Sequence, residues 1–125
     1  LVSRTLPALV GGNTVVVVAG EPAAIAAVEL AEALATSDFP GGSVNVLTGF
    51  ADELAPWLAG HMDVNAIDVT GIPEGERAEA ERLSAENVKR VVRARDVDPF
   101  SEDAQSPYEV TALMEFKTVW HPMGA

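Results

Sequence analysis

The chain contains no cysteine, few basic residues and no long hydrophobic run. Without cysteine, disulfides, thiolate metal ligands and a cysteine nucleophile are excluded for these residues. No apolar stretch approaches the roughly 20 residues of a membrane-spanning helix, and no secretory signal is present, so we expect a soluble, cytoplasmic protein without membrane contact. The 8 basic against 19 acidic residues argue against a nucleic-acid partner, because phosphate contacts need clustered Lys and Arg.

Standard nucleotide and hydrolase motifs are also missing. The chain has no Gly-x-Gly-x-x-Gly, no Gly-x-x-x-x-Gly-Lys and no Gly-x-Ser-x-Gly. No cluster of metal-ligand residues stands out, so no metal is expected. The basic residues that do gather in the sequence are interpreted as the solvated end of a strand rather than a binding surface: Lys89, Arg90, Arg93 and Arg95.

What is present is a repeated alternation of strand and helix patterns. At 125 residues the chain is long enough for one domain. Strands are expected at 14–19, 43–48, 66–70, 88–92 and 115–120, and helices at 23–36, 52–60 and 74–85. Residues 1–10 resemble the middle of a helix, and the missing initiator Met leads us to expect a processed or truncated polypeptide. The prediction is an α/β fold: an open, mostly parallel Rossmann-like sheet with helices on both faces, plus a C-terminal edge or intersubunit strand.

Some details of these helices are predicted as well. Asp52 is a plausible N-cap, and Pro73 sits where the first position of a helix would be. The helix at 23–36 carries apolar residues at helical spacing, which we expect to pack on the sheet: Ile25, Val28, Leu30 and Leu34.

Three positions are candidates for a phosphate or nucleotide site. Glu21 follows the first strand, where a carboxylate could accept hydrogen bonds from ribose hydroxyls or simply complement the next helix N-terminus. Thr70 and Gly71 end the third strand, where backbone N–H groups could meet a pyrophosphate, or where a tight turn could need glycine. His61 is expected at a helix C-terminus, where the dipole favours partly positive imidazole, rather than in catalysis.

An ordered set of short segments resembles the cofactor-binding domain of the aldehyde dehydrogenase superfamily. The matching positions are Pro7, Ala8, Leu9, residues 12–16, Glu21, Phe39, Pro40, Gly42, Val44, Asn45, Val46, Thr48, Gly49, His61, Asp63, Val64, Thr70, Gly71 and residues 87–91. The resemblance implies an NAD or NADP cofactor, with Glu21, Gly49, Thr70 and Gly71 as its contacts.

The departures from the family pattern concern the site itself. The family's ribose-binding Lys is Val18 here, and the Ser of its Thr-Gly-Ser turn is Ile72. Its general-base Glu aligns with Ala94, and its nucleophilic Cys has no counterpart. The resemblance places the oxyanion-stabilising Asn upstream of Leu1. Dinucleotide binding is therefore expected to be weak, and no catalytic residue is assigned.

The C-terminal residues resemble the family's last strand, which packs against a neighbouring subunit: Glu115, Phe116, Lys117, Thr118, Val119 and Trp120. The expected organisation is a cofactor-type domain at 1–96, an acidic linker at 97–110 and an oligomerisation strand at 111–125. We therefore expect a fragment or degenerate homologue that cannot oxidise aldehydes alone. The alternative is a non-catalytic assembly subunit that pairs through its last strand, as a homo-oligomer or with a partner subunit.

Overall fold

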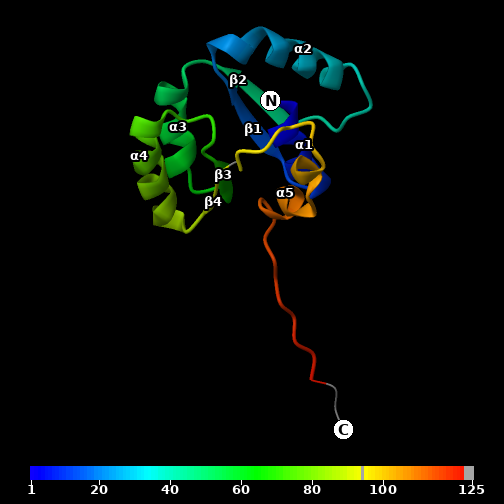
Figure 1. Ribbon diagram of the computed structural model, residues 1–125, viewed down its shortest axis with the longest axis vertical. Coiled ribbons are helices and arrows are strands. Elements are labelled where there is room, and N and C mark those ends of the chain that lie inside the picture. Colours follow the sequence, from blue (N-terminus) through cyan, green and yellow to red (C-terminus); the bar gives the residue numbers. More distant parts are fainter. Residues whose placement is uncertain (94, 123–125) are drawn as a thin grey trace.

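A computed structural model of the chain describes residues 1–93 and 95–122. It confirms the α/β class, with helices packed around short parallel strands (Figure 1). The strands are β1 Val15–Ala19, β2 Val44–Thr48, β3 Ala66–Asp68 and β4 Arg90–Val92. The helices are α1 Val2–Val10, α2 Ala24–Ala35, α3 Ala51–Gly60, α4 Glu74–Ser84 and α5 Pro107–Thr111, with 3-10 turns η1 Glu21–Ala23, η2 Ala85–Asn87 and η3 Glu102–Gln105.

The described strands form two parallel pairs rather than the single four-stranded sheet that the alternation predicted. β1 pairs with β2 from Val15 opposite Val44 to Ala19 opposite Thr48. β3 pairs with β4 only from Ala66 opposite Arg90 to Asp68 opposite Val92. Strands of three residues offer few ladder hydrogen bonds, so β3 and β4 satisfy each other and do not extend the first pair. The parallel strand-helix-strand connections are as expected.

Helix α4 begins at Glu74 as expected, but the predicted roles of Asp52 and Pro73 at the helix starts are one or two residues off. Phe50, in extended conformation, is the N-cap of α3, and Asp52 lies inside the first turn beside Glu53. Asp52 accepts a hydrogen bond from the adjacent Glu53 N–H, at 3.1 Å. Pro73 precedes α4 rather than opening it. Both acidic first turns still suit the positive end of a helix dipole.

The main core lies between α3, α4 and the end of β3. Its buried members are Ala55, Ala59, Ile67, Val69, Ile72 and Ala80, with Leu58 and Leu83 packed against them. Figure 1 shows α3 and α4 side by side, and the small alanine side chains allow this close approach. This half of the molecule therefore holds the main buried core of the described residues.

Helix α2 does not pack as the sequence predicted. Only Ala27 is fully buried, whereas Ile25 is 82% and Val28 54% exposed, and Leu30 and Leu34 are half-buried. A two-stranded sheet has a narrow face, so it covers Ala27 fully and Leu30 and Leu34 in part, and leaves Ile25 and Val28 exposed.

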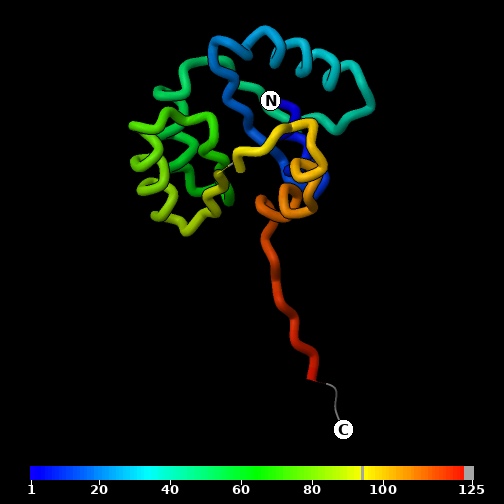
Figure 2. Tube along the Cα trace, in the orientation of Figure 1, coloured from blue at the N-terminus to red at the C-terminus, as the bar shows by residue number. Residues whose placement is uncertain are grey.

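The C-terminal part also differs from prediction. The segment expected as a linker, 97–110, contains η3 and the start of α5, which packs against α1. The residues expected as a strand, 115–120, are exposed and extended but belong to no strand. A strand needs a hydrogen-bonded neighbour. This segment instead extends away from the body of the molecule (Figures 1 and 2). Its partner role stays a prediction.

Candidate functional site

Glu21 and Gly49 lie at the same edge of the β1–β2 pair. Glu21 opens η1 directly after Gly20 and is exposed. The Gly49 N–H donates to the Ala19 carbonyl at 3.4 Å, which joins the turns that follow the two strands. The parallel register thus brings Gly49 next to the Glu21 turn, as carboxyl ends of parallel strands share one edge.

A Cβ at position 49 would lie 2.9 Å from Cδ1 of Leu54 in the first turns of α3. This methyl group is the end of a flexible side chain that can turn aside, so the contact opposes a larger residue only weakly. Packing therefore does not by itself explain the glycine at this position.

Thr70 and Gly71 follow the other strand pair, directly after Val69. The Thr70 N–H donates to Oδ1 of Asp68 at 2.9 Å, and the Thr70 hydroxyl donates to the same oxygen. At Gly71 a Cβ would meet nothing within 4 Å, and Gly71 does not have positive φ. The tight-turn explanation for Gly71 is therefore not supported by packing or backbone conformation.

Asp68 belongs to a charged network that sequence reasoning missed. Arg4 Nε donates to Asp68 Oδ2 at 2.6 Å, and Arg4 Nη1 donates to Glu109 Oε2 at 2.9 Å. Arg95 Nη2 donates to the other oxygen of Glu109 at 2.9 Å and to the Asp103 carbonyl at 2.8 Å. The network joins α1, the end of β3, α5 and the segment after β4.

Part of this network had a local sequence signal. An Asp two residues before Thr at the end of a short strand is the pattern of a turn in which the carboxylate accepts from the backbone. The ion pair between Arg4 and Asp68 had none, because 64 residues separate the two positions in the chain.

The residues that replace family positions take structural roles. Ile72 is 7% exposed and belongs to the core between α3 and α4. Val18 is half-buried in β1, in register with Leu47 of β2. Ala94 lies outside the described residues. The apolar side chain at position 72 thus stabilises the fold where the family presents a hydroxyl.

The basic residues near β4 lie in different surroundings. Lys89 is buried, and its Nζ donates to the His61 carbonyl at 2.7 Å at the end of α3. Burial lowers the pKa of Lys89, and the nearby Glu86 partly opposes this effect. Arg93 pairs with Glu81, and Arg95 with Glu109. The burial of Lys89 differs from the solvated strand end that the sequence predicted, whereas Arg93 and Arg95 remain largely exposed.

His61 is the C-cap of α3, where the sequence placed it. Its Nδ1 accepts a hydrogen bond from the Asp63 N–H at 3.2 Å.

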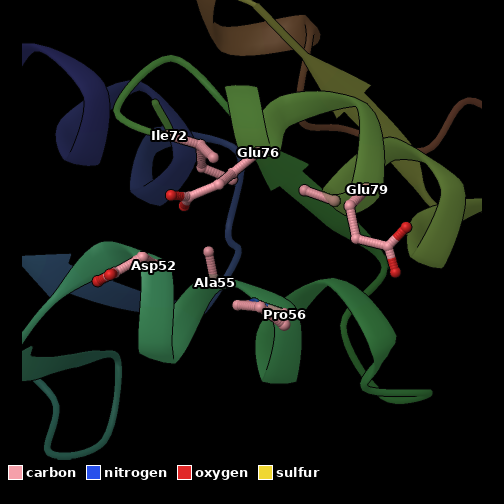
Figure 3. Close-up of a pocket in the computed structure, with 7 residues that line it drawn as sticks. Asp52, Ala55, Pro56, Ile72, Glu76 and Glu79 are labelled. Carbon is pink, nitrogen blue, oxygen red and sulfur yellow. The ribbon is translucent and has the colours of Figure 1, made fainter. Parts of the chain in front are cut away.

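A cavity of about 80 Å³ lies between α3 and α4 (Figure 3). Its lining includes Asp52, Glu76 and Glu79, but Glu79 points away from the other two in Figure 3. Glu79 is bound by Arg82, whose hydrogen bond lowers the Glu79 pKa. Sites for drug-sized ligands usually hold about 300–1,000 Å³, so this cavity is too small for a dinucleotide.

A wider, shallow depression of about 510 Å³ lies at the end of α3, lined by Pro56, Trp57, Gly60, His61 and Met62. It is open to solvent, and Trp57 is 79% exposed. Within residues 1–93 and 95–122, no group of three or more His, Asp or Glu side chains could hold a metal ion. In the same residues no helix has the length and apolar character needed to cross a membrane.

Comparison with known proteins gives the family. Residues 1–94 match the model of the aldehyde dehydrogenase family. The chain is 39% identical over 85 residues to a hydroxyisobutyraldehyde dehydrogenase of Mycolicibacterium austroafricanum. This match covers 68% of this chain and 17% of that protein. It is 29% identical over 122 residues to aldehyde dehydrogenase 1A1 of Equus caballus, covering 97% of this chain and 24% of that protein. No solved structure matches significantly. The chain belongs to the aldehyde dehydrogenase family and spans a small part of its relatives' length.

Members of this family generally use NAD or NADP, so the expected contacts can be tested for fit. Glu21 is accessible, but the Thr70 N–H and hydroxyl are already bound to Asp68. Ile72 faces the core instead of a ligand. As they stand, the residues at this turn do not fit a dinucleotide phosphate.

Proposed function

We propose that this chain is a cofactor-domain portion or degenerate homologue of an NAD(P)-dependent aldehyde dehydrogenase that does not oxidise aldehydes by itself. The observation that carries the proposal is the absence of cysteine from a chain that matches the family over residues 1–94. The family reaction needs a thiolate to add to the aldehyde carbonyl and a base to activate water. The position aligned with that base is Ala94.

Weak dinucleotide binding is the second part of the proposal. Val18 offers no charge to a ribose or phosphate, and Ile72 offers no hydroxyl. Each lost hydrogen bond to a charged group removes about 1.5–3 kcal/mol of binding free energy. Losing two such contacts is enough to move a micromolar affinity toward the millimolar range.

Calorimetric titration of the 125-residue chain with NAD and with NADP tests binding, and NADH formation with a panel of aldehydes tests turnover. The expected result is no sub-millimolar binding and no NADH above a blank without protein. A full-length family member is the positive control. Sub-millimolar affinity would revive a cofactor role, and turnover would overturn the proposal altogether.

A second candidate function is assembly through the C-terminal segment. Phe116 is 72%, Val119 69% and Trp120 87% exposed, in an extended backbone. Such a segment suits addition to the edge of another chain's sheet, where its backbone N–H and C=O groups would be paired. The occupant we propose is a second copy of this chain or a partner subunit.

Deletion of residues 115–125 followed by light scattering tests the assembly role. The intact chain is expected to have a mass above that of a monomer, and the truncated chain the mass of a monomer. A matched variant keeps the length but replaces Phe116, Val119 and Trp120 with serine, and it should behave like the deletion. An intact chain that is already monomeric would rule out a second copy of this chain as the occupant.

A further inference from the structure

We propose that residues 95–114 form a strap that is held closed over α1 by Glu109 and opens as one unit while the core between α3 and α4 stays folded. The strap follows β4 and contains η3 and α5. It leads directly into the extended C-terminal segment, so its position decides where that segment starts. Its opening requires neither a bound cofactor nor assembly, and it therefore goes beyond both proposed functions.

The strap has a defined seat on α1. Figure 2 shows this part of the chain beside α1, before it continues into the tail. α5 packs against α1, and Met114, which follows α5, lies on Gly11 at the C-cap of α1. A Cβ at Gly11 would be only 2.9 Å from Cγ of Met114. Opening of the strap would therefore uncover Met114.

The carboxylate of Glu109 joins the strap to the body of the molecule. Its Oε2 accepts from Arg4 Nη1 at 2.9 Å, and its Oε1 accepts from Arg95 Nε at 3.1 Å and Nη2 at 2.9 Å. Arg4 belongs to α1 and is itself held by Asp68, whose Oδ2 lies 2.6 Å from Arg4 Nε. The Glu109 side chain is 19% exposed, so water screens these attractions less than it would on an open surface. One carboxylate thus ties α5 and the first residue of the strap to α1.

Apolar burial does little to hold the strap closed. None of residues 95–114 is fully buried, and the large side chains of Phe100 and Tyr108 are 94% and 78% exposed. In the core, by contrast, Ala59 and Val69 are 0% exposed. Segments with few buried apolar contacts open locally at a lower free-energy cost than a packed core does. Loss of the Glu109 ion pairs should therefore release the strap and leave the core folded.

Because the chain has no cysteine, one introduced thiol can report this opening. Met114→Cys places that thiol at the seat on Gly11, and the rate at which a disulfide reagent such as DTNB labels it measures how often the strap is open. The rate is measured in the otherwise unchanged chain and with Glu109→Gln. Glutamine keeps the size of the side chain, but its amide nitrogen cannot accept from a guanidinium, so labelling should be at least about tenfold faster.

Glu81→Gln is the matched control, because it removes the same charge from an ion pair with Arg93 that lies outside the strap. It should leave the labelling rate of Met114→Cys unchanged. Ser84→Cys, at a residue that is 0% exposed, is the corresponding probe of the core. It should be labelled equally slowly with and without Glu109→Gln.

Labelling of Met114→Cys that is no faster with Glu109→Gln than with Glu81→Gln would overturn the inference. Equal acceleration at Ser84→Cys would overturn it as well, because the whole chain would then be opening. Should Glu109→Gln not fold, Arg95→Gln decides by the same comparison, with Arg93→Gln as its control. The proposed functions are tested separately, by NAD binding and by the mass of the intact chain.

Discussion

Among the described residues other than glycine, Val88 is the one whose backbone has positive φ. Its φ is 56° and ψ 32°, and its side chain is 89% exposed. The left-handed conformation costs an ordinary residue about 1–2 kcal/mol, and a β-branched one is especially unfavourable there. Glycine has no such penalty, but it loses more backbone freedom on folding, which lowers the stability of the folded state by about 0.5–1 kcal/mol. We expect Val88→Gly to stabilise the chain by about 0.5–1 kcal/mol, measured by urea denaturation.

Val16 provides the matched control for this substitution. It is also a partly exposed valine, 46% exposed, but it lies within β1. Val16→Gly should destabilise by about 1 kcal/mol, because glycine weakens a strand interior. A loss of stability in Val88→Gly equal to that in Val16→Gly would contradict the strained conformation.

At the scale of elements, α1 and the segment after α5 are in close contact. A Cβ at Gly11, the C-cap of α1, would lie 2.9 Å from Cγ and 3.1 Å from Sδ of Met114. Gly11 has φ −74°, so alanine fits its backbone, and what opposes it is the contact with Met114 together with Asn13 Nδ2 at 3.1 Å. We expect Gly11→Ala to cost about 1–2 kcal/mol, from the same denaturation measurement.

The double variant shows whether the two elements touch. Met114→Ala removes Cγ and Sδ of Met114 and leaves Asn13 Nδ2, so Gly11→Ala should cost less in that background, with a coupling of at least about 0.5 kcal/mol. Independent effects of the two substitutions would mean that the segment after α5 does not lie on α1.

For the whole molecule, the dominant feature is a net charge of −11. Arginines pair locally with glutamates, as in Arg93 with Glu81 and Arg82 with Glu79, but acidic residues remain in excess. Mutual repulsion of like charges destabilises a compact state, and salt screens it as the Debye length falls from about 30 Å at 0.01 M to about 8 Å at 0.15 M.

We therefore expect the urea midpoint to rise when NaCl is increased over this range. KCl should give the same rise, which would separate screening from binding of a particular ion. A midpoint that falls with salt would mean that the ion pairs, including Arg4 with Asp68, outweigh the repulsion.

The elements with strong local patterns were predictable. The valines of β1 form a strand, and the acidic first turn and terminal Arg82 of α4 mark a helix. The segment at 115–120 was not, because a strand forms only beside a partner and none is provided in the described chain. Likewise, spacing alone could not show that Ile25 would face solvent, since that depends on the width of the sheet beneath it.

In the candidate site, too, some features follow from the sequence and others depend on tertiary structure. The positions of Glu21, Gly49, Thr70 and Gly71 after their strands follow from sequence, because strand ends are marked by glycine and polar residues. The role of Asp68 does not, because it depends on Arg4 and Glu109, which lie 64 and 41 positions away in the chain.

The sequence by itself determined the α/β class, the family and the absence of a cysteine nucleophile, because these depend on local patterns and residue types. Tertiary structure alone decided that the strands form two separate pairs and that Thr70 is bound by a carboxylate held from α1. Hydrogen bonds and ion pairs between distant segments depend on how the chain packs, and packing brings together residues that no local pattern connects.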